Sequence, residues 1–132
     1  MKNRIICVNN KNMKELTEKF RKDKDMFMVE IEGKDIKNLQ EYFSCISELC
    51  MFPTISRSWS SYEDWMRDFC WIEQKKITII IYNFKYFMQS DIQARNEIIE
   101  DFEELIFPWW ESEVLQFEVG GETKEFMVYL VD

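Results

Sequence analysis

Carboxylate side chains are the groups in this sequence whose type and spacing could do chemistry, and the first set lies in residues 58–72. Asp64 and Asp68 stand four residues apart, and Ser60 precedes them at the same interval. Because residues four apart share one face of a helix, we expect these three side chains on a common face. Such a face can simply solvate the helix or can meet a basic partner, and the spacing leaves both interpretations open.

A second acidic set lies in residues 91–107, where another helix is expected. Glu97 and Asp101 form a like-charged pair four residues apart, and Glu100 and Glu104 form another. Each such pair destabilises an isolated helix by roughly 0.3 kcal/mol. A sequence that keeps several of these unfavourable pairs either solvates a surface or displays it to a cation-rich partner. The two acidic faces could form one negative patch if the two helices are neighbours.

The composition removes most kinds of catalytic site. The chain has no histidine, which excludes the commonest general base, and its three glycines form no phosphate-binding loop. Carboxylates alone could build a metal site or a glycosidase pair, but these are expected to point outward from helices rather than into a cleft. We therefore predict no enzyme activity, no metal and no cofactor. A metal-dependent carboxylate enzyme is the least favoured alternative.

Length and charge indicate one acidic globular domain. The chain has 132 residues, of which 46% are hydrophobic and 32% charged, enough to bury a core without disulfides. Its formal net charge of −8 repels phosphate backbones and favours a basic protein partner, so we expect no nucleic acid. No apolar run could span a membrane, and the four cysteines lack a CxxC pair. We therefore predict a cytoplasmic protein with reduced thiols and no membrane contact.

Apolar periodicity indicates the elements that must position these carboxylates. Ser60 is the predicted N-cap of the central helix and Glu63 its capping-box partner, with apolar residues on the opposite face. Asp35 is the predicted cap of the preceding helix, and Pro108 is expected to end the last one. Strands are expected at residues 4–8, 26–31, 77–82, 114–119 and 125–131, and helices at residues 12–22, 35–50, 58–72 and 91–107.

These elements predict an α/β domain with a small, mostly parallel β-sheet of about three to four strands flanked by helices. The β-branched run at residues 77–82 is expected to be its buried middle strand. Residues 1–24 are expected to form an N-terminal strand–helix extension within a single domain spanning residues 1–132. Residues 114–131 contain Gly120 and Gly121 between two strand-like segments, so they could form a hairpin.

The order of elements and two local segments resemble the barstar family, small acidic bacterial inhibitors of secreted ribonucleases. The likeness begins at IEGKDI, residues 31–36, and is sharpest at WSSYEDWMRDFCWI, residues 59–72. The buried strand, a helix ending near tryptophan (98–110) and a final strand (126–131) follow in the family's order. The resemblance covers about residues 28–132 and implies a barstar-like fold.

In that family, carboxylates of this loop and helix plug the basic active site of a ribonuclease and take the place of phosphates. The resemblance puts Asp64 on the aspartate that contributes most, Ser58 on a loop asparagine and Glu63 on an aromatic contact position. Glu104 falls on a glutamate of the later helix. The resemblance therefore implies an immunity-type inhibitor whose partner is a basic ribonuclease toxin.

Two departures from the family pattern keep an alternative open. Ser60 stands where the family has a second helix aspartate, and the loop at residues 53–58 is about one residue short. Both favour a domain that has kept the fold as a protein-interaction module without nuclease-inhibitor activity. The predicted partner-binding residues are Ser58, Ser60, Glu63, Asp64, Asp68, Glu97, Asp101 and Glu104.

Overall fold

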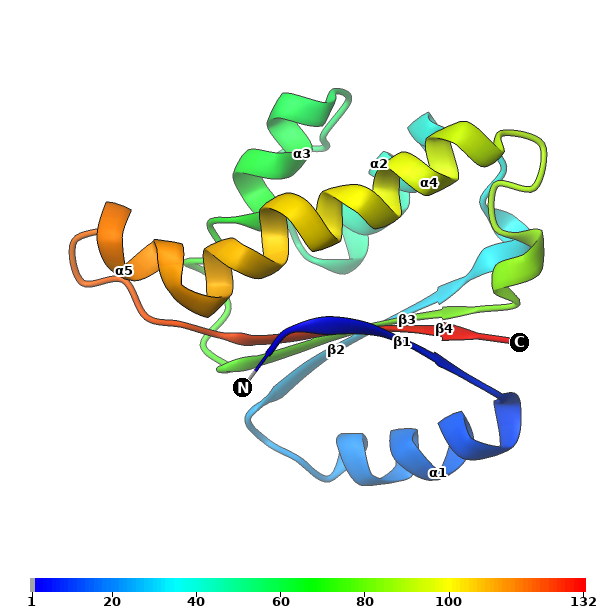
Figure 1. Ribbon diagram of the computed structural model, residues 1–132, viewed down its shortest axis with the longest axis horizontal. Coiled ribbons are helices and arrows are strands. Elements are labelled where there is room, and N and C mark those ends of the chain that lie inside the picture. Colours follow the sequence, from blue (N-terminus) through cyan, green and yellow to red (C-terminus); the bar gives the residue numbers. More distant parts are fainter. Residues whose placement is uncertain (1) are drawn as a thin grey trace.

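The computed structural model describes residues 2–132 as one twisted parallel sheet with helices on both faces (Figure 1). Within these residues the sheet has four strands in the order β1-β4-β3-β2, and all neighbouring strands run parallel. The predicted α/β class with a small parallel sheet is therefore confirmed. The strands are β1 Arg4–Val8, β2 Met26–Glu32, β3 Lys76–Tyr82 and β4 Glu125–Val131, and the α-helices are α1 Asn10–Arg21, α2 Leu39–Leu49, α3 Trp59–Met66, α4 Ile92–Asp101 and α5 Val114–Phe117.

Strand β3 lies inside the sheet, as its sequence predicts. It pairs with β2 on one side and β4 on the other, with Ile79 opposite both Val29 and Val128. Five consecutive residues of β3, from Ile77 to Ile81, are buried. A strand covered on both faces favours apolar, β-branched residues on both sides, which explains why Thr78 is the only polar residue in this run.

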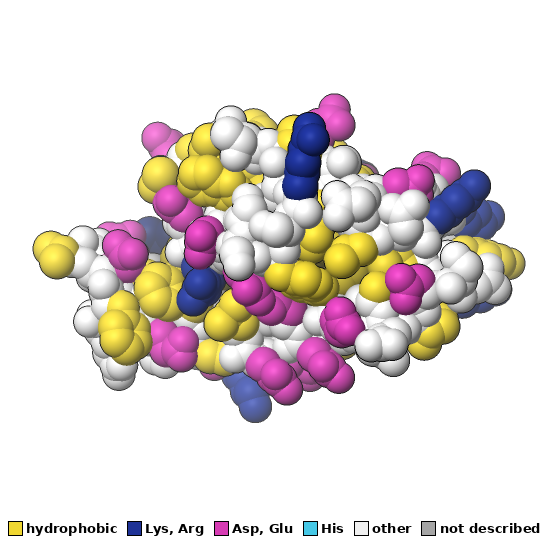
Figure 2. Space-filling view, turned by 90° about the horizontal axis from the view of Figure 1, so that it is seen from above, with side chains coloured by type: hydrophobic (Ala, Val, Ile, Leu, Met, Phe, Trp, Pro, Cys, Tyr) yellow, Lys and Arg dark blue, Asp and Glu magenta, His cyan; other side chains and the backbone are white. Residues whose placement is uncertain are grey.

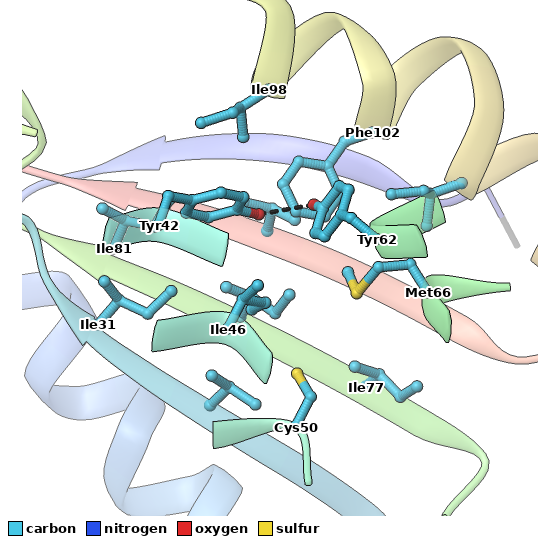
Figure 3. Close-up of a cluster of buried hydrophobic side chains, with 14 of the residues drawn as sticks. Ile31, Tyr42, Ile46, Cys50, Tyr62, Met66, Ile77, Ile81, Ile98 and Phe102 are labelled. Atoms are coloured by element: carbon cyan, nitrogen blue, oxygen red, sulfur yellow. Dashed lines mark hydrogen bonds between the residues drawn. The ribbon is translucent and has the colours of Figure 1, made fainter. Parts of the chain in front are cut away.

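The main core lies between the sheet and the helices α2, α3 and α4 (Figure 3). Tyr42 of α2 and Tyr62 of α3 meet at its centre, and their hydroxyl oxygens are 2.6 Å apart. Met66, one turn after Tyr62, is also fully buried. These contacts seat α3 against the core by a single face, so its opposite face must be exposed.

The other face of the sheet is covered by α1 (Figure 1). Met13 of α1 is fully buried and packs in a second cluster with Ile80 of β3 and Tyr129 of β4. Strand β1 adds the edge of the sheet, with Ile6 opposite Tyr129. The N-terminal strand expected from the sequence thus forms one edge of the sheet, and the helix that follows it covers one face of the sheet.

Both predicted helix caps are wrong by two or three residues. Asn38, not Asp35, caps α2, because its side chain accepts from the Glu41 amide at 2.9 Å. Ser58, not Ser60, caps α3 by accepting from the Ser61 amide at 3.2 Å. Each true cap stands three residues before the amide that it satisfies, and each has extended backbone angles. The capping box predicted between Ser60 and Glu63 is therefore absent.

The segment from α4 to α5 also differs from the prediction. The helix does not end at Pro108, because π-helical turns at Phe102–Ile106 and Trp109–Glu113 carry it across that residue into α5. Val114–Phe117 is helical, so the strand predicted at residues 114–119 is wrong, and the hairpin that residues 114–131 could have formed is absent. Strand β4 instead runs parallel to β3, an arrangement that requires a crossover and excludes a tight hairpin.

An acidic surface shared by α3 and α4

The exposed face of α3 carries Ser60 and Asp64. Burial of Tyr62 and Met66 turns this face to solvent, and the Asp64 side chain is 75% exposed. Asp68 is exposed too, but α3 ends at Met66, so Asp68 lies in the turn after the helix instead of on the predicted helical face. There Asp68 accepts a hydrogen bond from the Cys70 amide at 3.0 Å.

Glu63 connects α3 with the later helix. Its carboxyl lies in a shallow cavity of about 520 Å³, which we call the α3–α4 hollow. Figure 2, which looks down on the helix-covered side of the molecule, shows acidic side chains gathered on this face. The later acidic set is therefore joined in this hollow by Glu63, whereas Asp64 and Asp68 of the first predicted set do not line it. The α3–α4 hollow is lined by Trp59, Glu63 and Arg67, and by Glu97, Glu100, Asp101, Glu104 and Leu105.

Asp101 and Glu63 form a carboxyl pair within this hollow. Burial, followed by the hydrogen bond and negative charge of Glu63, raises the pKa of Asp101 to about 8, and the charge of Glu104 acts in the same direction. Arg67 opposes the shift. Among residues 2–132 no N–H or hydroxyl group donates to the buried Oδ2 of Asp101. With its pKa raised to about 8, Asp101 favours its neutral, protonated form at neutral pH.

Arg67 lines both cavities of this surface and is absent from the predicted site residues. Its guanidinium lies 3.5 Å from the Asp64 carboxylate and 5.7 Å from the centre of the Trp109 ring, and its Nε donates to the Glu63 carbonyl at 3.3 Å. Its position three residues after Asp64 and four after Glu63 was the signal that could have found it. Arg67 partly offsets the negative charge of Asp64 and Asp101.

Asp64 and Asp68 face a second cavity, of about 630 Å³, between the end of α3 and the segment after α5. We call it the α3–α5 hollow. Lys124 also lines it, but its ammonium group is already engaged, donating to the carbonyls of Ile72 and Gln74 at 3.2 and 2.6 Å. Glu118 and Glu122 add two carboxylates to its rim, so the charge left unpaired there is negative.

Ser58 and Ser60 line neither hollow. Both are exposed, and the hydroxyl of Ser58 is occupied in capping α3. Six of the eight predicted site residues are thus distributed over the two hollows, which share Arg67, while the two serines lie outside them.

The arrangement suits the binding of cations carried by another molecule. The described residues 2–132 hold no group of three or more Asp, Glu or Cys side chains that could share a metal ion. Cys7, Cys45, Cys50 and Cys70 are all free thiols. In the same part of the chain, no helix is long and apolar enough to cross a membrane. What the surface offers is exposed carboxylate charge beside partly buried aromatic rings.

Comparison with protein families gives a match over most of the chain. The family described as Barstar (barnase inhibitor) matches residues 26–130. That range contains α3, α4 and both hollows, whereas β1 and α1 precede it. No curated protein and no solved structure matches the chain.

Proposed function

The chain belongs to the barstar family of ribonuclease inhibitors, and we propose that it is an immunity-type inhibitor of a basic ribonuclease toxin. In this proposal the acidic surface of α3 and α4 covers the active site of the nuclease and occupies its phosphate-binding groups. The protein acts in the cytoplasm, catalyses no reaction and needs no metal or cofactor.

The exposure of Asp64 is the observation that carries the proposal. This carboxylate is exposed on a helix whose backbone is anchored in the core, so only its side chain must be ordered when a partner binds. Coupling between close charge pairs at such interfaces reaches several kcal/mol. A nuclease that binds RNA phosphates presents the matching cations.

Inhibition of a panel of purified basic ribonucleases, with barnase among them, tests the proposal. We expect stoichiometric loss of RNA hydrolysis by at least one nuclease, and a weakening of that complex by about 2 kcal/mol, roughly 30-fold in Kd, for Asp64→Ala. The measurement is the Kd of each variant by calorimetry, together with the residual nuclease activity.

Glu18→Ala is the matched control. It also removes one exposed carboxylate, but from α1 on the opposite side of the sheet. The control is expected to leave the Kd within about twofold, because the screened field of a distant surface charge is weak. Equal effects of Glu18→Ala and Asp64→Ala would show that only net charge matters, which contradicts a defined acidic surface.

Ser60 favours a second candidate function, a barstar-fold interaction module that no longer inhibits a nuclease. Its exposed hydroxyl stands on the same face of α3 as Asp64, where a second carboxylate would strengthen the contact with a cationic active site. A chain that inhibits no ribonuclease of the panel, while its Ser60→Asp variant does inhibit barnase, would support the module and contradict the inhibitor.

A further inference from the structure

An apolar lip borders the α3–α5 hollow where the chain leaves α5. Val119, just after α5, is fully exposed, and Phe117, at the end of α5, is 72% exposed. Phe117 stacks on Trp109 with the rings 6.4 Å apart and 11° from parallel, and Trp109 lines the hollow together with Val119. In Figure 2 hydrophobic side chains protrude at the left end of the molecule, where this segment lies in Figure 1.

The hollow itself combines an apolar floor with a negative rim. Phe69 and Ile72, at the bottom, are buried. The two cations of the rim are both committed within the chain, Arg67 to Asp64 and Trp109, and Lys124 to two carbonyl oxygens. A ligand would therefore meet exposed carboxylates, among them Asp68, Glu118 and Glu122, together with exposed apolar side chains.

We propose that the α3–α5 hollow and its lip, Trp109, Phe117 and Val119, form a second contact area for the same basic protein partner, which seats an apolar side chain against the lip. This inference rests on the proposed function and extends the interface beyond α3 and α4. Asp64 borders this hollow, so a partner bound at Asp64 reaches the lip without leaving the acidic surface.

Charge complementarity selects a basic partner over a second copy of this chain. The rim carries Asp64, Asp68, Glu118 and Glu122. Two copies meeting through this area would bring their carboxylates together, in a chain of net charge −8. Like charges brought together at an interface cost several kcal/mol. A cationic surface that also bears an apolar side chain satisfies both parts of the hollow.

Dissociation rates of single variants test the inference, with the ribonuclease of the panel that the wild-type chain inhibits most strongly as the probe. We expect Val119→Ser to raise the dissociation rate constant roughly fivefold and to leave the association rate unchanged, because a short-range apolar contact does not steer encounter. The same ratio is expected at about 50 and about 200 mM NaCl, whereas the effect of Asp64→Ala on association shrinks with salt.

Leu115→Ser is the matched control. Leu115 is 60% exposed on α5 but does not line the hollow, so its change is expected to leave dissociation within about twofold. If Asp64→Ala weakens the complex and Val119→Ser leaves dissociation unchanged, the second contact area is wrong while the proposed function stands. If the wild-type chain binds no ribonuclease, the proposed function fails first and this inference with it. A wild-type dimer in sedimentation that Val119→Ser dissociates would assign the lip to self-association and overturn the inference.

Discussion

At the scale of single residues, the acidic side chains of this surface have different protonation states and different roles. Asp64 is well exposed and is paired only loosely, with Arg67. Asp101 is partly buried against Glu63, and its raised pKa means that it carries a proton at neutral pH. The number of negative charges that a partner meets is therefore smaller than the number of carboxyl groups in the hollow, and it increases with pH.

We predict that Asp101→Asn removes a pH dependence of folding stability. Between pH of about 4 and about 8 the folded protein holds a proton on Asp101 that the unfolded chain releases, so the free energy of unfolding of the wild type falls as pH rises through this window. In the variant that contribution is lost. Urea unfolding at several pH values measures the free energy of unfolding of both proteins. The difference between the two values cancels the contributions of other titrating groups.

The pH dependence of binding affinity is expected to have the opposite sign to that of folding stability. A cation of the partner placed against Asp101 favours the charged form of this carboxyl and expels its proton, so the affinity of the wild type should rise with pH up to about 8. A difference between wild type and Asp101→Asn that does not change with pH, in either measurement, would mean that the pair holds no proton in the folded state.

At the scale of elements, α3 positions the surface through its cap and its two buried anchors. Ser58 supplies the cap, so the serine that the family resemblance assigns to partner contact also has a structural role. The anchors Tyr62 and Met66 could be predicted from helical periodicity. The cap could not, because Ser58, Ser60 and Ser61 are chemically equivalent and only the backbone angles of Ser58 select it.

Removal of the cap is expected to destabilise the protein. Ser58→Ala should lower the free energy of unfolding by about 1 kcal/mol, because the Ser61 amide loses its acceptor. Ser60→Ala, on the exposed face of the same helix, should change it by less than about 0.5 kcal/mol. Chemical unfolding of the two variants measures both values. A larger loss of unfolding free energy for Ser60→Ala than for Ser58→Ala would mean that Ser60, and not Ser58, is the N-cap of α3.

The other differences between the predicted and the observed elements also have local physical causes. The strands at β1, β2 and β3 were predictable, because runs of β-branched and apolar residues have few alternatives. Residues 114–119 were not, because an alternating pattern around Val114 fits a buried helical turn as well as a strand. Pro108 was expected to stop the helix, since proline lacks an amide, but the wider π turns on both sides carry the chain past it.

At the scale of the whole molecule, different helices cover the two faces of the sheet, and the acidic surface lies on one side only. Helices α2, α3 and α4 cover one face and carry the acidic surface, whereas α1 covers the other face and lies before the family match. The acidic carboxylates could be predicted as a set from charge and spacing. Their division into two hollows could not, because it depends on Arg67 and on the path of the chain after α5.

We expect the N-terminal helix to stabilise the fold without taking part in binding. Met13→Ala should lower the free energy of unfolding by roughly 2–4 kcal/mol, because Met13 is fully buried between α1 and the sheet. Lys14→Ala, at an exposed position of the same helix, is the control and should be nearly neutral. The Kd for the nuclease should be unchanged in both variants at a temperature where they remain folded. A specific loss of affinity in Met13→Ala would place α1 in the interface.

The mode of inhibition tests the central claim most directly, because a protein that covers the active site must compete with RNA. Initial rates of the inhibited ribonuclease should be measured over a range of RNA and inhibitor concentrations. An inhibitor that covers the active site is expected to be competitive, so the apparent inhibition constant should rise in proportion to the RNA concentration while kcat is unchanged. Inhibition that lowers kcat and is unaffected by RNA would mean that this acidic surface binds the nuclease away from its active site, and occlusion would be wrong.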